Sequence, residues 1–294
     1  MRKKIALFIF ILPILALAKP IVSTTIMPTK FFIEQIAGDE IEVNVMVPSS
    51  ADPHTYDPKP SQMKKLENSD LYFEVGVEFD EIWLKKIASD FKSVKFIKTQ
   101  NGIEKIPMTH HDHDHEHHDR DDKRHKHKHR EHGTLDPHIW LDPILVKTQS
   151  KNILNALCEK YVEKCEKFSA NQAEFEKKLD ELDSFAKENL SNLKNNKFIV
   201  YHPSWGYFAN RYNLEQIAIE IEGKEPKPAD LAKLIEEAKE ENAKVIFVAP
   251  QFSKKAAEQI ATQSNASVVE INHLSDDWLN EMKKTIEIIL KSLK

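Results

Sequence analysis

A strand, a helix and a second strand follow one another within residues 21–48, which read IVSTTIMPTKFFIEQIAGDEIEVNVMVP. The β-branched run at 21–26 predicts a strand, the apolar periodicity at 30–39 predicts a helix that ends at Gly38, and the run at 41–48 predicts another strand. Short connections in a strand-helix-strand order are typical of a parallel sheet covered by helices. The stretch therefore predicts an α/β fold.

The same alternation extends outward from this stretch and resumes after a long helical segment at 144–196. We therefore predict two lobes, each with a roughly four-stranded parallel sheet and flanking helices, joined by a long backbone helix. Further strands are predicted at 71–77, 94–99, 197–203, 214–221, 244–250 and 266–272, and further helices at 60–70, 79–90, 204–212, 228–243, 253–264 and 276–293. The expected division is a first lobe at 19–160, a linking helix at 161–196 and a second lobe at 197–294.

The first eighteen residues form a separate segment. A basic start, an apolar run too short to span a membrane and the small residues Ala16 and Ala18 predict a secretory signal peptide at 1–18, cleaved before Lys19. An uncleaved membrane anchor is the alternative. Lys19, not a cysteine, directly follows the predicted cut, so we expect an exported, non-lipidated protein in the periplasm of a Gram-negative bacterium.

Composition excludes some classes of function. The formal net charge is -5 and the isoelectric point is near 6.3, which argues against a nucleic-acid partner. None of the six glycines forms a phosphate-binding loop pattern. The two cysteines, Cys158 and Cys165, lack the spacing of a cysteine metal site. Export favours a disulfide between them, whereas an unbroken helix would hold their Cα atoms roughly 10 Å apart, so both states stay open.

Ten of the fourteen histidines lie in one charged stretch, residues 110–132. The stretch has no aliphatic residue and no Phe, Tyr or Trp, so it cannot build a core, and a disordered His-rich loop is expected at 108–133 within the first lobe. Its imidazoles and carboxylates offer many weak metal sites, although a solvated linker without a role is the alternative. The ten are His110, His111, His113, His115, His117, His118, His125, His127, His129 and His132.

The remaining four histidines occur singly. They are His54 in DPHTYDP, His138 in DPHIWLDP, His202 near the end of the strand at 197–203, and His273 after the strand at 266–272. Ligands of parallel sheets gather beyond the carboxyl ends of strands, and a cleft between two lobes is a favoured binding place. Converging imidazoles suit a transition metal such as tetrahedral zinc, whereas calcium and magnesium prefer oxygen. A single histidine often has a structural role, but the shared position of these four favours a metal site.

At these residues the sequence resembles the ZnuA-type zinc-binding proteins of bacterial ABC zinc-uptake transporters. The resemblance covers nearly the whole chain after residue 18 and includes a His- and acid-rich loop before the second motif. It is carried by SSADPHTYDPKPSQMKKLENSDLYFEVGVEFDEIW (49–83), DPHIWLDP (136–143), YHPSWGYFANRYNL (201–214) and EPKPADLAKLIEEAKEENAKVIFVAPQF (225–252).

The resemblance implies that His54, His138 and His202 hold Zn²⁺ between two lobes linked by a long helix. It also implies a break in the helical region near 162–165, which would permit the disulfide. The fourth ligand stays open, because many relatives have Asp-Pro where this chain has Asn272 and His273, and some have Glu where Pro53 precedes His54. The candidates for a fourth ligand are His273, Asp276, Asn272 and a water.

The expected function is that of a periplasmic receptor, a monomer and not an enzyme, which captures zinc and delivers it to a membrane ABC permease. A manganese receptor on the same fold is the main alternative, and a third imidazole argues against it because manganese favours carboxylate oxygen. A secreted zinc hydrolase lacks an obvious general base in this sequence. A zinc buffer that needs no permease is the last alternative, and the His-rich loop could deliver, sense or buffer zinc.

Overall fold

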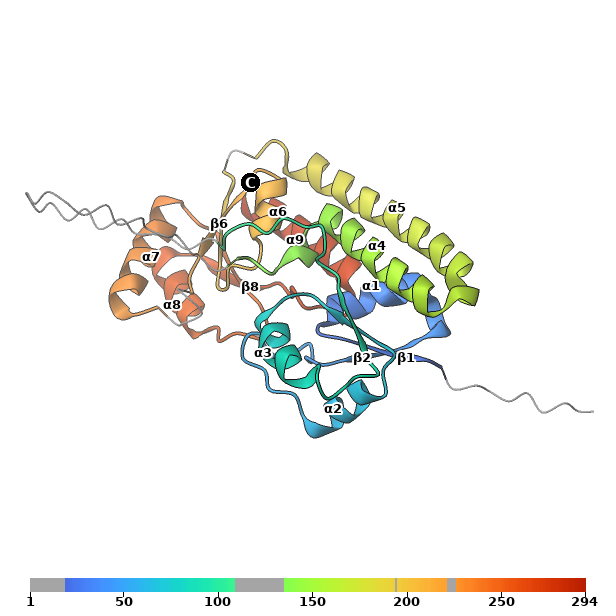
Figure 1. Cartoon of the computed structure of the whole chain (residues 1–294). Helices are drawn as coiled ribbons and strands as arrows, with labels where there is room; N and C mark the ends of the chain where they lie inside the picture. The colour runs from blue at the N-terminus through green and yellow to red at the C-terminus, as the bar shows by residue number, and fades with distance from the viewer. Residues whose placement is uncertain (1–18, 109–134, 194, 221–225) are drawn as a thin grey trace, which may run out of the picture.

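The computed structural model describes residues 19–108, 135–193, 195–220 and 226–294 (Figure 1). The predicted signal peptide and all but the first residue of the predicted His-rich loop lie outside the described residues. None of the helices in the described part is long and apolar enough to span a membrane.

The first lobe is built on a four-stranded sheet in the order β2-β1-β3-β4, in which all strand pairs are parallel. This confirms the predicted sheet, although each strand is shorter than the apolar run from which it was predicted. The elements are β1 (Ile21–Thr24), α1 (Met27–Ala37), β2 (Glu42–Val45), α2 (Pro60–Glu67), β3 (Leu71–Glu74), α3 (Glu78–Ile87) and β4 (Lys95–Lys98).

The second lobe repeats this plan with the order β6-β5-β7-β8, again with parallel pairs only. The two central strands are β1 and β3 in the first sheet and β5 and β7 in the second. Both lobes therefore have the same strand topology. The elements are β5 (Lys197–Val200), α6 (Gly206–Arg211), β6 (Glu215–Ala218), α7 (Pro228–Glu240), β7 (Val245–Val248), α8 (Lys255–Ser264), β8 (Ser267–Glu270) and α9 (Trp278–Ser292).

Two helices lie between the lobes in sequence, α4 (Pro143–Lys160) and α5 (Cys165–Leu190), and they pack side by side (Figure 1). Helix α5 is 26 residues long and therefore extends over roughly 39 Å. It contacts α1 of the first lobe and α9 of the second. Helix α5 is the long helix that joins the lobes, and it begins and ends within the predicted 161–196.

Aromatic side chains pack α1, α5 and α9 against one another. Phe32 of α1 lies with its ring centroid 5.8 Å from Phe175 of α5 and 5.1 Å from Trp278 of α9. All three side chains are fully buried in one hydrophobic core that contains residues from both lobes. Because this core is continuous, the two lobes are held together by packing as well as by chain connectivity.

A disulfide joins Cys158 near the end of α4 to Cys165 at the start of α5. The helix stops at Lys160, and a 3-10 turn at Val162–Lys164 brings the two Cα atoms to 4.6 Å. A continuous helix would have kept them too far apart, so the break is what allows the bond. The structure thus decides the alternative that the sequence left open.

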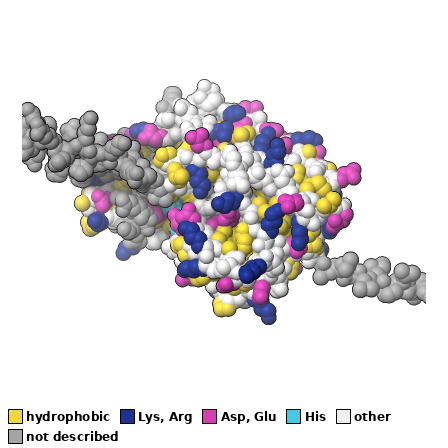
Figure 2. All heavy atoms as spheres, in the orientation of Figure 1, with side chains coloured by type: hydrophobic (Ala, Val, Ile, Leu, Met, Phe, Trp, Pro, Cys, Tyr) yellow, Lys and Arg dark blue, Asp and Glu magenta, His cyan; other side chains and the backbone are white. Residues whose placement is uncertain are grey.

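Charged side chains of both signs are interspersed over the visible face of the molecule (Figure 2). Among the described residues on that face, no continuous area of Lys and Arg stands out. This distribution agrees with the small negative net charge of the chain.

Candidate metal centre

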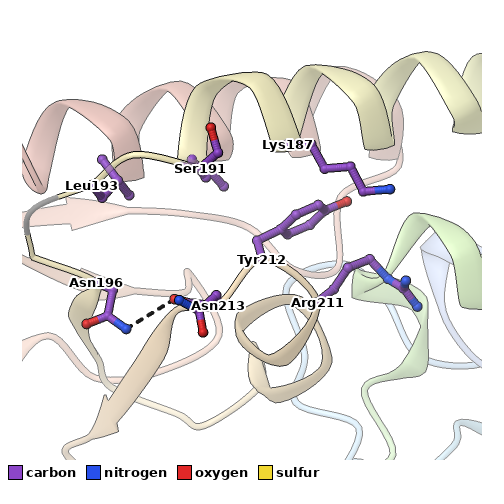
Figure 3. A pocket seen from close by; sticks show the side chains of 8 residues that line it. Lys187, Ser191, Leu193, Asn196, Arg211, Tyr212 and Asn213 are labelled. Atoms are coloured by element: carbon purple, nitrogen blue, oxygen red, sulfur yellow. Dashed lines mark hydrogen bonds between the residues drawn. The ribbon is translucent and has the colours of Figure 1, made fainter.

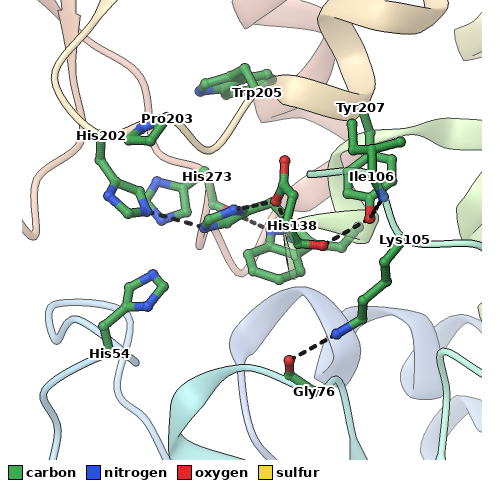
Figure 4. A network of polar contacts seen from close by, with 12 residues as sticks. His54, Gly76, Lys105, Ile106, His138, His202, Pro203, Trp205, Tyr207 and His273 are labelled. Carbon is green, nitrogen blue, oxygen red and sulfur yellow. Dashed lines mark hydrogen bonds and ion pairs between the residues drawn. The ribbon is translucent and has the colours of Figure 1, made fainter. Parts of the chain in front are cut away.

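Three histidines from distant parts of the chain converge where the lobes meet. His54 follows β2, His138 precedes the 3-10 turn at Ile139–Leu141, and His202 follows β5 (Figure 4). One ligand nitrogen from each lies within 4.8 Å of the other two, and the Nε2 atoms of His138 and His202 are 3.2 Å apart. His54 and His202 thus lie at the carboxyl edges of the two sheets, and the segment before the 3-10 turn brings His138 to them.

The loop that carries His54 is shaped by the residues just before it. The backbone N–H of His54 donates to Asp52 Oδ1 at 2.9 Å, which closes a tight turn around Pro53. The His54 side chain is 17% exposed, and its Nδ1 lies 2.5 Å from Glu78 Oε2 at the start of α3. His54 is thus at the mouth of the site, with one ring nitrogen held by a carboxylate.

His138 is the most deeply buried of the three histidines, at 1% exposure. Asp136 Oδ1 accepts the backbone N–H of His138 at 2.8 Å and also contacts its Nδ1 at 2.7 Å. Tyr207 of α6 fixes this segment by donating to the carbonyl of Asp136 at 2.8 Å. Gly206 allows the close approach, because a Cβ there would lie 2.6 Å from Asp136 Oδ2.

His202 is held from two directions. Its Nδ1 lies 2.9 Å from Glu220 Oε2 just beyond β6, and its ring stacks on Phe252 with centroids 4.8 Å apart. Both His202 and Glu220 are buried. The ring orientation is therefore set by a carboxylate on one edge and an aromatic face on the other.

The three imidazoles share one arrangement, in which Nδ1 faces a carboxylate. A carboxylate partner fixes the ring and leaves the other nitrogen, Nε2, to bind a metal. Sequence reasoning missed all three partners, Glu78, Asp136 and Glu220. Asp136 had a signal, since both DPH motifs place Asp two residues before His, but only in the second motif does that Asp contact the ring. The other two are distant in sequence and become neighbours only through the fold.

The protonation of the buried rings favours metal binding. Burial lowers the pKa of His138 and of His202 well below the usual imidazole value, and the neighbouring imidazoles add to this effect. Both rings are therefore neutral at pH 7, which is the form that binds zinc. Burial also raises the pKa of their carboxyl partners, Asp136 and Glu220, to about 7.

His54 differs from the two buried rings. Burial opposes its charge, but the hydrogen bond and the negative charge of Glu78 outweigh that effect and raise the pKa of His54. Although burial works in the opposite direction, the same contact lowers the pKa of Glu78 to about 2. Of the three rings, His54 is thus the one on which a proton competes most strongly with a metal ion.

Of the three residues that we considered as a fourth ligand, His273 alone lies beside the cluster. Its ring centroid is 6.0 Å from that of His138 and 6.2 Å from that of His202. The side-chain oxygen of Asn272 instead accepts hydrogen bonds from the backbone N–H of Leu274 and from Gln251. Asp276 is exposed. The ten histidines of the His-rich loop lie outside the described residues.

A separate cavity of about 290 Å³ lies between the end of α5 and α6 (Figure 3). Lys187 and Arg211 at its edge are paired with Asp183 and Asp142, respectively. Their charges are neutralised by these carboxylates, so the cavity lacks the character of an anion site. It is also distinct from the three histidines, which are not among its lining residues.

Comparisons with known proteins identify zinc-uptake proteins over nearly the whole chain. The family model described as zinc-uptake complex component A, periplasmic (ZnuA), matches residues 22–292. Over 272 residues the chain is 31% identical to the high-affinity zinc uptake system protein ZnuA of Bacillus subtilis (strain 168), which covers 91% of this chain and 82% of that protein.

Solved structures agree in fold. A crystal structure of ZnuA matches with a TM-score of 0.84 and 36% identity, covering 94% of this chain and 100% of that chain. A zinc-bound ZnuA deletion mutant matches with a TM-score of 0.83 and 35% identity, covering 94% and 99%. The zinc-bound ZnuA-like domain of AdcA from Streptococcus pneumoniae matches with a TM-score of 0.75 and 25% identity, covering 94% and 99%. The chain belongs to the ZnuA family of periplasmic zinc-uptake components.

Proposed function

We propose that this protein is a periplasmic zinc receptor that binds Zn²⁺ through His54, His138 and His202 and delivers it to an ABC permease. The observation that carries the proposal is the convergence of the three imidazoles, each held at Nδ1 by a carboxylate. Carboxylate–histidine–zinc arrangements of this kind orient the ligand and increase its basicity. Membership of the ZnuA family supports zinc as the cargo and a zinc-uptake permease as the partner.

The donor set favours zinc over manganese. Three neutral imidazoles suit zinc, whereas manganese favours carboxylate and water oxygens. The carboxylates nearest to the site contact ring nitrogens, so they support the histidines and do not offer a manganese-like oxygen set. Because these carboxylates are already engaged, none of the three is free to act as the general base of a zinc hydrolase.

The further parts of the proposal rest on the sequence. We propose that the chain is exported by a cleaved signal peptide at 1–18, is not lipidated and acts as a monomer. We also propose that the His-rich loop at 108–133 collects zinc weakly near the tight site, since short flexible tethers give effective concentrations of the order of mM.

Single alanine substitutions test the ligand set. His54→Ala, His138→Ala and His202→Ala are each expected to raise the zinc Kd by more than about 100-fold, because the loss of an outer-shell partner alone costs about 10–100-fold. Chelator competition with one equivalent of zinc measures the tight site. His125→Ala is the matched control, since it removes one imidazole of the His-rich loop and is expected to leave the tight Kd unchanged. An unchanged Kd in all three ligand variants would refute the assignment.

A further inference from the structure

Among the four single histidines, His273 is the one without an assigned partner for its ring. It follows β8, is 3% exposed, and lies next to His138 and His202 (Figure 4). Its Nδ1 is buried and has no hydrogen-bond partner among the described residues. A buried polar nitrogen without a partner is unfavourable, so its position beside a cluster of metal-binding groups needs an explanation.

The spacing of the neighbouring histidine rings suggests why His273 lies at this position. Within the group of His54, His138 and His202, ring centroids lie 4.9–5.7 Å apart. His273 lies only slightly farther out, at 6.0 and 6.2 Å from two members of the group. The ring nitrogens of His273 are not among those that lie within 4.8 Å of one another, so the ring would have to shift toward the cluster to bind the same ion.

The backbone of His273 is held by a hydrogen bond, whereas its buried ring is positioned by stacking on neighbouring rings. Trp140 Nε1 donates a 2.8 Å hydrogen bond to the carbonyl of His273, and Trp140 itself is fully buried. The His273 ring faces Phe252 with centroids 6.2 Å apart, and no described carboxylate holds its Nδ1. The main chain therefore places the imidazole beside the cluster, and no described hydrogen bond to Nδ1 opposes a shift of the ring toward a bound metal.

We propose that His273 supplies a fourth nitrogen to the bound zinc, which makes the site a tetrahedron of four imidazoles. The inference rests on the proposed function, since it adds a ligand to the same site. His54 would close the tetrahedron from the exposed mouth, and His273 from the buried floor. The competing side chain, Asn272, has its oxygen engaged by Leu274 and Gln251 and is directed into the turn.

Four protein ligands would leave no coordination position for water. Closed four-coordinate sites hold zinc without activating a water molecule, whereas catalytic sites keep one open position. The set would also disfavour manganese further, since all four donors would be neutral nitrogen. His273 is therefore proposed as a determinant of both metal choice and the absence of hydrolytic chemistry at this centre.

X-ray absorption spectroscopy of the full-length protein with one equivalent of zinc tests the inference directly. The number of imidazoles around the metal is obtained from the scattering of the rings, and four are expected. His273→Asn is expected to give three imidazoles and one oxygen. Three imidazoles in the unsubstituted protein, with no change in His273→Asn, would overturn the inference.

Cobalt substitution provides a second measurement. The visible bands of Co²⁺ respond to the identity of its donors, so His273→Asn and His273→Ala are both expected to shift them, while the control Asp276→Ala leaves them unchanged. The same spectrum in all four proteins would overturn the inference. Thermal unfolding of the metal-free variants identifies any that fail to fold. If a variant does not fold, the number of imidazoles measured in the unsubstituted protein decides whether His273 binds the metal.

The outcomes separate this inference from the proposed function. If the unsubstituted protein binds zinc tightly and loses it in the His54, His138 and His202 variants, but has only three imidazoles around the metal, the receptor function stands and the role of His273 is refuted. If tight zinc binding is absent altogether, the proposed function fails and the fourth ligand fails with it.

Discussion

The indole Nε1 of Trp140 donates a 2.8 Å hydrogen bond to the backbone carbonyl of His273, 133 residues farther along the chain. In turn, Trp278 Nε1 donates a 3.0 Å hydrogen bond to the carbonyl of Trp140. These two bonds connect the segment after His138 with the turn after β8 and with the start of α9. The positions of His138 and His273 are thus set by the same buried pair of tryptophans.

Trp140→Phe is expected to lower the stability of the protein and to weaken zinc binding. The substitution removes the donor to a buried carbonyl, and an unsatisfied buried group costs about 1–3 kcal/mol. Denaturant unfolding of the metal-free protein measures the free energy of unfolding, and chelator competition measures the Kd.

The matched control is Trp83→Phe, because Trp83 is only partly buried in α3 and lies beneath Lys86. It is expected to leave the zinc Kd unchanged. Equal effects of the two substitutions on the Kd would contradict a specific role of Trp140 in the site.

Glu220→Ala is expected to raise the zinc Kd by about 10–100-fold, the usual cost of losing a carboxylate that orients a ligand histidine. The physical reason is that His202 would lose the partner of its Nδ1, 2.9 Å away, and with it the preferred orientation of Nε2. Isothermal titration with a competing chelator measures the change. Glu215→Ala, at the exposed start of β6, is the control, and an equal loss there would argue against the orienting role.

Zinc affinity is expected to fall with decreasing pH through the protonation of one imidazole. His138 and His202 have lowered pKa values and stay neutral, whereas the pKa of His54 is raised by Glu78. Since zinc binds the neutral ring, affinity is full above the pKa of His54 and falls about tenfold per pH unit below it. As the pH decreases, log Kd is therefore expected to start to rise at a pH above 6.5, the ordinary imidazole pKa, with a slope that corresponds to one proton.

Glu78→Gln sharpens this test. Without the negative charge the pKa of His54 decreases, so the fall in affinity is expected to begin at a lower pH than in the unsubstituted protein. Glu81→Gln, on the exposed side of α3, is expected to leave the profile in place. A slope of two or three protons in the unsubstituted protein would show that groups other than His54 also lose protons on binding, either the buried rings or the carboxyl groups of Asp136 and Glu220, whose pKa values are about 7, contrary to the prediction.

Gly206→Ala is expected to weaken zinc binding although the glycine does not approach the metal. The added Cβ would lie 2.6 Å from Asp136 Oδ2, so the carboxylate that holds His138 must move. Competition titration reports the loss of affinity. Gly38→Ala is the control for general destabilisation, because its φ of 62° makes alanine strained, and the added Cβ would contact Asn171 and none of the site residues. It is expected to lower the melting temperature without a change in the Kd, and a similar Kd for both variants would refute the prediction.

The order of strands and helices was predictable because each element has a clear apolar period, as in residues 21–48, and because the carboxyl ends of parallel strands share an edge. That same rule brought His54, His202 and His273 to one place. It does not identify Glu78 or Glu220, since nothing near these residues in the sequence links them to a histidine. Likewise, the spacing of Cys158 and Cys165 alone leaves their pairing undecided, because it depends on a helix break that propensities do not define.

The shared carboxyl edge also has a consequence for the assembly of the chain. His54 belongs to the first lobe and His202 to the second, so a polypeptide in which one half is still unfolded offers an incomplete ligand set. Tight zinc binding would then require both lobes to be folded. Bound zinc would add RT ln(1 + [L]/Kd) to the free energy of unfolding of the folded protein. A receptor built this way does not hold its ion firmly until it is fully formed.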